Sequence, residues 1–311
     1  MNRTLIVAAL ATLVSGAALA QSSVTIYGRL NLSVERQNNN GIKTTVLQNS
    51  SSRLGFKGSE DLGGGLRAGF VLEHGFNPDT GTAAASFWGR QSEVNLSGGF
   101  GTVRLGTFTS EAYYATSDYI GMHNHETGTS SDALYAYVGR NTNKVAYRTP
   151  EFVKGLTVEA ALSLNESSPA NARSYDFAAN YQVGNLHLGL GYEKFGKAKQ
   201  TALSALYEAG PVIFGAMVQR DSEAYGPGNR TNVRGSVAYI FGLNELHLNV
   251  GVADDYSKLS DSGARQFTVG YNYNLSKRTK MYAFYTKVDA ERFTPYAGDF
   301  SSLAAGVRHN F

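Results

Sequence analysis

Apolar and polar residues alternate along most of this chain, and this alternation restricts its fold more than any other feature of the sequence. In residues 24–35, VTIYGRLNLSVE, every second position from Val24 to Val34 carries an apolar residue or glycine, and the positions between them carry polar residues or tyrosine. Successive side chains of a β-strand point to opposite faces, so this segment is predicted to be a strand with one apolar and one polar side. A soluble sandwich would turn the apolar side inward, whereas a membrane barrel would turn it towards lipid.

The same two-residue period recurs to the last residue, without a helical period of comparable length or a change in composition that would mark a linker. The 35 Gly, 19 Tyr and 16 Phe of the chain favour turns and strands. We therefore expect a single all-β domain over residues 21–311. Its sixteen expected strands are residues 23–37, 50–58, 66–74, 87–97, 102–108, 141–149, 156–165, 174–181, 186–193, 201–208, 212–219, 231–240, 245–253, 265–273, 279–288 and 301–311.

Residues 1–20 have the features of a secretory signal peptide. A basic Arg3 precedes an apolar run over residues 5–14, and the small residues Ala18 and Ala20 flank Leu19 just before Gln21. A membrane-anchoring helix is the alternative, but the run is shorter than the roughly 20 residues that a span needs. No other stretch reaches that length, so a mature chain that enters a membrane is expected to do so with strands.

The connections between the expected strands alternate between short and long. SEDLGGG, SGGFG, TPEFVKG, QVGN, EAGP, FGLN and NLSKR are short, and the connections between them are longer and polar. An antiparallel meander with an even number of strands, tight turns at one end and long loops at the other is typical of an outer-membrane barrel, whose turns are periplasmic and whose loops are extracellular. In such a barrel the apolar side of each strand faces lipid.

Tyrosines near the strand ends fit the same interpretation, because a membrane barrel carries amphipathic rings at both interfaces. A soluble sheet could also use them as cross-strand pairs, but it would have to divide this meander into two or three sandwiches without a linker. The tyrosines on the apolar side are Tyr181, Tyr192, Tyr207, Tyr239, Tyr271 and Tyr273.

Charge, cysteine and histidine content argue against several other classes of protein. The 28 Lys and Arg and 25 Asp and Glu residues are interspersed, so we expect no nucleic-acid partner, and the absence of cysteine excludes a disulfide scaffold or a thiolate metal site. None of the six histidines lies in a nucleophile or HExxH setting, so we predict no catalytic residues and no enzyme. His123, His125 and Glu126 could chelate a metal, but a polar loop without matching ligands favours an unliganded pair, and we predict no metal or cofactor.

The last expected strand, SSLAAGVRHNF, ends the chain on Phe311. Together with SSVTIYG after the signal peptide and SRLGFKGSEDLGGGLRAGFVLE further along, this ending resembles the general porin family of Gram-negative outer membranes, in its beta-proteobacterial branch. VNLSGGFGTVRLGT, VAYRTPEF and YNYNLSKRTKMYAFYTKV extend the similarity along the whole mature chain.

The resemblance implies a homotrimer of sixteen-stranded barrels, each with a water-filled pore that the third extracellular loop narrows. It implies passive diffusion of small hydrophilic solutes and ions, contact with outer-membrane lipid and lipopolysaccharide, and insertion by a barrel assembly machinery that reads Phe311 as a signal. A solute-specific porin, an outer-membrane barrel enzyme and a surface β adhesin are the alternatives.

The resemblance also places Arg53, Arg90 and Arg140 in a basic cluster on the barrel wall facing the third loop, residues 109–139. Alternation independently predicts that Arg53 points inward, and that Arg140 does so together with Lys144.

Arg90 does not follow the alternation, because it shares its side with Val94 and Leu96. On a regular strand it would face lipid, at a cost of about 2–4 kcal/mol near the midplane. Either a bulge intervenes or the family assignment does not hold at this position.

Carboxylates of the third loop could form the negative side of the pore, with Asp118 as the preferred constriction residue beside Glu111, Glu126 and Asp132. We expect the basic wall to outweigh this acidic side and make the channel mildly anion-selective. A general and a solute-specific porin both fit the sequence.

Overall fold

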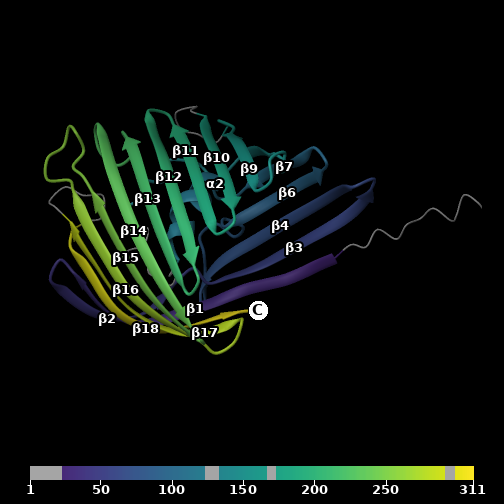
Figure 1. Ribbon diagram of the computed structural model, residues 1–311. Helices are drawn as coiled ribbons and strands as arrows, with labels where there is room; N and C mark the ends of the chain where they lie inside the picture. Colours follow the sequence, from purple (N-terminus) through teal and green to yellow (C-terminus); the bar gives the residue numbers. More distant parts are fainter. Residues whose placement is uncertain (1–22, 123–132, 167–172, 291–297) are drawn as a thin grey trace, which may run out of the picture.

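The computed structural model describes residues 23–122, 133–166, 173–290 and 298–311 (Figure 1). The expected signal peptide, residues 1–20, lies outside the described residues. Within the described part of the chain, no helix has the length and apolar character needed to cross a bilayer.

Nearly all described elements belong to one antiparallel sheet that closes on itself. β1 (Ser23–Asn39) pairs with β18 (Phe300–Asn310) on one side, and Figure 1 shows the chain end beside it. On its other side, β1 pairs with β3 (Arg53–Gly63) along its first half and with β2 (Ile42–Asn49) along its second half. Because β1 pairs with strands on both of its sides, the first and last strands of the sheet meet and the sheet closes into a barrel, as a membrane-spanning sheet requires.

The barrel has sixteen strand positions, as expected. β2 and β3 together fill one position, interrupted at residues 50–52. β5 (Thr82–Ala83) pairs only with the last two residues of β4 (Leu66–Asn77), outside the main sheet. The remaining strands are β4 (Leu66–Asn77), β6 (Gln91–Gly98), β7 (Gly101–Thr107), β8 (Lys144–Arg148), β9 (Leu156–Ser163), β10 (Ser174–Val183), β11 (Leu186–Phe195), β12 (Ala198–Ala209), β13 (Val212–Ser222), β14 (Asn229–Phe241), β15 (Asn244–Ala253), β16 (Ala264–Asn274) and β17 (Thr279–Ala290).

Each of the sixteen expected strands falls on a strand of the structure, but the sequence analysis missed β2. A two-residue turn at Asn40 and Gly41, with φ of 50° and 88°, joins β1 to β2. Both angles are positive, as a type I′ turn requires, and Asn-Gly is the pair that favours this turn most strongly. The signal for the hairpin was therefore present, although the polar residues of β2 hide its alternation.

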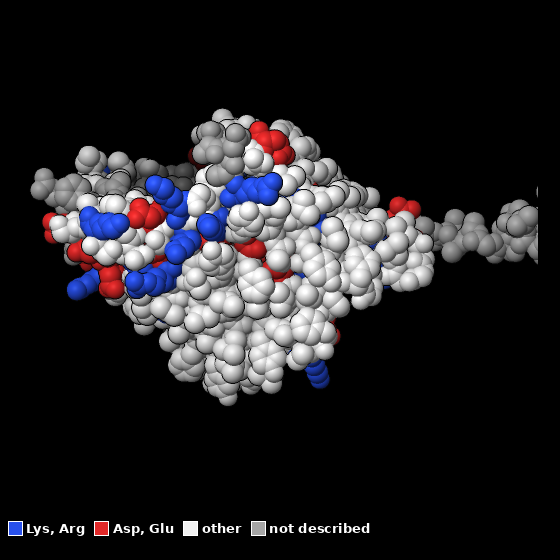
Figure 2. All heavy atoms as spheres, turned by 90° about the horizontal axis from the view of Figure 1, so that it is seen from above, with Lys and Arg blue, Asp and Glu red and all other residues white. Residues whose placement is uncertain are grey.

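The apolar side of the strands faces outward, which confirms the barrel interpretation. Val24, Ile26 and Val34 are between 58% and 66% exposed, whereas Asn31 and Glu35, on the polar side of the same strand, are buried. Figure 2 shows charged residues gathered towards the left and upper part of the molecule, and a wide area in the lower centre that carries almost none. The outer surface thus matches lipid and the lumen is polar, as in transmembrane barrels.

Tight turns lie at one end of the barrel, including those at Gly184, Gly210 and Gly242, each with a positive φ. The opposite end carries the long connections, among them residues 108–143, but it is less uniform than expected. Only Gly196 and Lys197 separate β11 from β12 at that end, where a longer loop was expected.

Candidate functional site

The third loop, residues 108–143, enters the barrel and is described except for residues 123–132. Its first part forms short helical segments, α2 (Glu111–Tyr113), η1 (Tyr114–Asp118) and α3 (Tyr119–Gly121). The side chain of Ser110 accepts a hydrogen bond from Ala112 N at 3.2 Å and caps the first turn.

Glycines of the barrel wall let the helical segments lie against β11. A Cβ at Gly189 would come within 2.0 Å of the carbonyl oxygen of Ala115, and one at Gly191 within 2.7 Å of that of Ala112. Beside them, Ser204 Oγ donates to the same Ala115 oxygen at 2.8 Å. The wall is therefore shaped for this loop, and the loop cannot lie so close to a wall with larger side chains at these positions.

The returning part of the loop, residues 133–138, is held by inward polar side chains. The amide of Gln219 bonds both backbone groups of Ala136, at 2.8 and 3.1 Å. Asn232 Nδ2 donates to the carbonyl oxygen of Leu134 at 2.6 Å, and Glu193 Oε2 accepts from Val138 N at 3.1 Å. These bonds satisfy backbone groups that would otherwise be buried without partners.

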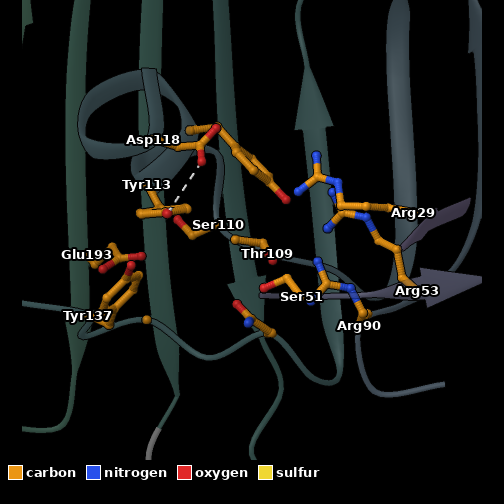
Figure 3. Close-up of a pocket in the computed structure, with 13 residues that line it drawn as sticks. Arg29, Ser51, Arg53, Arg90, Thr109, Ser110, Tyr113, Asp118, Tyr137 and Glu193 are labelled. Atoms are coloured by element: carbon orange, nitrogen blue, oxygen red, sulfur yellow. Dashed lines mark hydrogen bonds between the residues drawn. The ribbon is translucent and has the colours of Figure 1, made fainter. Parts of the chain in front are cut away.

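A cavity of about 490 Å³ lies between the loop and the wall formed by β1, β3 and the residues before β6 (Figure 3). Arg29, Arg53 and Arg90 line it from the wall, and Figure 3 shows them on the side opposite Asp118 and Glu193. The side facing the arginines therefore carries carboxylates, and a field runs across the lumen.

Two of the three arginines share one carboxylate on their own side. Glu73 accepts from Arg90 Nε at 2.7 Å and lies 3.9 Å from Arg53 Nε, and it also accepts from Tyr27 Oη at 3.0 Å. Arg29 donates to Asn310 Oδ1 at 3.4 Å and forms no ion pair with any described carboxylate. Three guanidinium groups and one carboxylate therefore leave an excess of two positive charges among the described residues of this wall.

The structure brings together Arg53 and Arg90 and explains the position of Arg90. β6 begins at Gln91, so Arg90 precedes the strand and the alternation with Val94 does not govern its direction. Arg29 was not among the sequence-predicted site residues. Its signal was present, because it lies on the polar side of β1 with Asn31.

Arg140 and Lys144 do not join this cavity, which corrects the expected basic cluster. Lys144 Nζ lies 2.7 Å from Asp176 Oδ2, and both side chains are buried. Arg140 precedes β8. Its guanidinium lies over the ring of Phe195 at 5.6 Å and donates to Thr142 Oγ1 at 3.3 Å. The third loop covers Lys144, since the ring of Phe108 lies 5.0 Å from its ammonium.

The expected acidic residues of the third loop are also divided. Asp118 lines the cavity and accepts a hydrogen bond from Tyr113 Oη at 3.4 Å. Glu111 lines a neighbouring hollow instead, where its carboxylate contacts Arg148 Nη2 at 2.5 Å. Glu126, together with His123 and His125, lies outside the described residues. Among the residues that are described, no group of three or more His, Asp or Glu could hold a metal ion.

A chain of alternating charges attaches Glu111 to the wall. Arg148 bridges Glu111 and Glu159, and Arg104 bridges Glu159, at 3.1 Å, and Glu93, at 2.7 Å. Such charge-assisted pairs are the strong hydrogen bonds of proteins, so they hold α2 at a defined place in the lumen.

Replacing Lys144 with methionine is expected to destabilise the barrel by about 3–5 kcal/mol, because Asp176 is left as a buried charge without its partner. The double variant Lys144→Met/Asp176→Leu should recover most of this loss. Unfolding midpoints in detergent, followed by the change in gel mobility, measure both. Equal stability of the single and double variants would contradict the buried pair.

Acidification from pH 7 to pH 5 is expected to shift the ion selectivity of the barrel lumen towards anions. Burial raises the pKa of Glu111 above its ordinary value, although Arg148 opposes the shift, so this carboxylate gains a proton at a higher pH than an exposed one. The zero-current potential in a salt gradient measures the change. Glu111→Gln should show the acidic behaviour already at pH 7, whereas the exposed Glu60→Gln should retain the pH dependence of the unmodified channel.

A closed barrel of sixteen antiparallel strands, apolar outside, polar within and narrowed by an internal loop, defines a membrane channel. A family model described as Gram-negative porin matches residues 6–292. The chain belongs to the Gram-negative porin family.

Individual relatives agree with this membership. Outer membrane porin protein 32 of Delftia acidovorans is 32% identical over 100% of both chains, and a major outer membrane protein P.IB of Neisseria meningitidis serogroup B is 29% identical over 100% of both. The solved structure of an anion-selective porin from Comamonas acidovorans matches with a TM-score of 0.79 at 28% identity, covering 94% of this chain and 100% of that one. This chain is thus an outer-membrane porin that forms a channel for passive diffusion.

Proposed function

We propose that this porin passes small hydrophilic solutes with a mild preference for anions. The observation that carries the proposal is the difference in access between the charges at the cavity. The Arg53 and Arg90 side chains are 21% and 33% exposed, whereas Glu73 and Glu193 are buried, and among the described lining residues Asp118 is the one carboxylate that is partly exposed. A permeating ion in the cavity therefore has access to more guanidinium groups than carboxylates, and in a narrow passage accessible charge decides which ion is enriched.

The zero-current potential across a bilayer with unequal KCl concentrations tests this proposal. At about 0.1 M salt, where the Debye length is roughly 10 Å, chloride should be the more permeant ion. At about 1 M the length falls to roughly 3 Å, so the preference should largely disappear. A potential of the opposite sign at low salt would contradict the proposal and leave the family membership unchanged. The anion-selective porin from Comamonas acidovorans supports the same sign.

We also propose that the chain is exported with cleavage after Ala20, assembles as a homotrimer among outer-membrane lipid and lipopolysaccharide, and acts without catalysis. The amphipathic outer surface supports contact with lipid. Migration of unheated and heated samples on a detergent gel, together with the amino-terminal sequence of the purified protein, tests the trimer and the cleavage. Hydrolase probes that label the purified barrel would contradict the absence of catalysis.

A further inference from the structure

Aromatic side chains of the third loop line the cavity. Tyr113, Tyr114 and Tyr137, all from the third loop, line it, and Tyr114 and Tyr137 remain 44% and 45% exposed. The ring centroid of Tyr113 lies 5.6 Å from that of Tyr114 and 5.0 Å from that of Tyr137. These distances fall in the range of interacting aromatic pairs, so the three rings form one continuous surface. We call these three side chains the tyrosine surface.

The tyrosine surface is held in place from behind. The buried Tyr135 meets Tyr113 at 5.6 Å and Tyr137 at 4.9 Å, both nearly edge to face. Tyr225 Oη accepts a hydrogen bond from the backbone N of Tyr137 at 2.9 Å. Because the supporting groups fix the loop backbone and the rings, binding to the tyrosine surface would require little further ordering.

Guanidinium donors lie across the cavity from Tyr113 and Tyr137. Figure 3 shows Arg29 and Arg53 extending towards the side that carries Tyr113 and Asp118. Arg29 makes one hydrogen bond, at 3.4 Å, and Arg53 shares Glu73 with Arg90, which leaves donors on both for a further acceptor. A planar guanidinium suits a carboxylate in particular, because two parallel hydrogen bonds can form.

We propose that the cavity is an affinity site for aromatic monocarboxylates on their way through the pore. The carboxylate lies at Arg29 and Arg53, and the ring packs on Tyr114 and Tyr137. An aliphatic acid of similar size makes the ionic contact with the arginines but no aromatic contact. A neutral aromatic compound makes only the aromatic contact with the tyrosines. The cavity volume of about 490 Å³ lies within the roughly 300–1,000 Å³ of ligand pockets. This inference rests on the proposed anion preference and specifies its substrate class.

The test compares benzoate with cyclohexanecarboxylate, which has the same charge and a similar size but no aromatic ring. Each is added to single channels in dilute KCl, and the concentration that halves the chloride current is measured. The concentration of benzoate that halves the current should be about two- to tenfold lower than that of cyclohexanecarboxylate, as expected for one aromatic contact. The double variant Tyr114→Leu/Tyr137→Leu should lower this ratio to about one.

Two further variants separate the aromatic contact from general damage to the channel. Tyr114→Phe/Tyr137→Phe keeps both rings and should keep the ratio. Tyr239→Leu removes an exposed ring from the outer face of β14 and should change neither concentration. Heat-modifiable gel mobility establishes that each variant is folded.

Equal concentrations for the two acids, a ratio that survives in the leucine double variant, or no effect of either acid would each overturn the inference. The chloride to potassium permeability ratio of the same channels is recorded in parallel. A chloride preference without a preference for benzoate removes only the aromatic site, whereas a potassium preference removes the proposed function itself.

Discussion

Replacing Phe311 with aspartate is expected to reduce folded barrel in the outer membrane to a trace. The backbone N and O of Phe311 exchange hydrogen bonds with Gly28, both at 3.1 Å, and complete the pairing of the last strand with the first. The Phe311 ring lies on the bare backbone of Gly28, where a Cβ would come within 2.4 Å of it. Aspartate loses this contact, puts a charge on the lipid-facing side and removes the proposed assembly signal. Comparison of heated and unheated outer-membrane fractions measures the folded protein.

Refolding of the same variant in detergent separates the two reasons for the loss. If Phe311 acts as a signal for the assembly machinery, the purified Phe311→Asp chain should still refold in detergent, where no machinery is present. If its role is closure of the barrel, refolding should fail as well. Phe311→Tyr keeps the ring and serves as the matched control. Normal amounts of folded Phe311→Asp barrel in cells would contradict both roles.

Gly28→Val changes β1, the strand that pairs with β18, and should also prevent closure of the barrel. A Cβ at Gly28 would lie 2.5 Å from the backbone oxygen of Arg53, which cannot move without disturbing the pairing of β1 with β3. This variant keeps Phe311 and hence the proposed assembly signal, but its barrel cannot close. Folded barrel should therefore be absent both in cells and after refolding in detergent.

The double variant Arg29→Ser/Arg53→Ser is expected to shift the zero-current potential in a KCl gradient towards the value for a potassium-selective channel, while the channel stays open. Both guanidinium groups line the cavity, and a unit charge at 4 Å contributes about 1 kcal/mol in water. Loss of two such charges should change the chloride to potassium permeability ratio several-fold. The partly exposed Asp118 remains on the opposite side and then favours cations.

Arg140→Ser is the matched control, because it removes the same charge from a residue that does not line the cavity. It should leave the potential nearly unchanged. The effect of the double variant should shrink at about 1 M salt, where the Debye length of roughly 3 Å screens the remaining charges. If Arg140→Ser shifted the zero-current potential as much as the double variant does, the assignment of Arg29 and Arg53 to the site would be contradicted.

The sequence by itself determined the barrel, its strands and the side that faces lipid. The strands depend on a period of two residues, which is local and can be read from segments such as Val24–Val34, and the side that faces lipid followed from the alternation of short and long connections. The interruption at residues 50–52 and the Asn-Gly hairpin before β2 also have local causes, although the hairpin was missed. The inward direction of Arg53 followed from the same alternation.

Only the tertiary structure decided which inward charges meet at the cavity. Lys144 and Arg53 both lie on the polar side of a strand, but the third loop covers Lys144 and Asp176 neutralises it, while Arg53 faces the open lumen. Arg29 joins the cavity because the hairpin of β1 and β2 continues into β3, where Arg29 pairs with Arg53, and Arg90 joins it from outside a strand. The physical reason is that alternation specifies a face, whereas neighbours across a barrel depend on closure and on loop packing between residues distant in sequence.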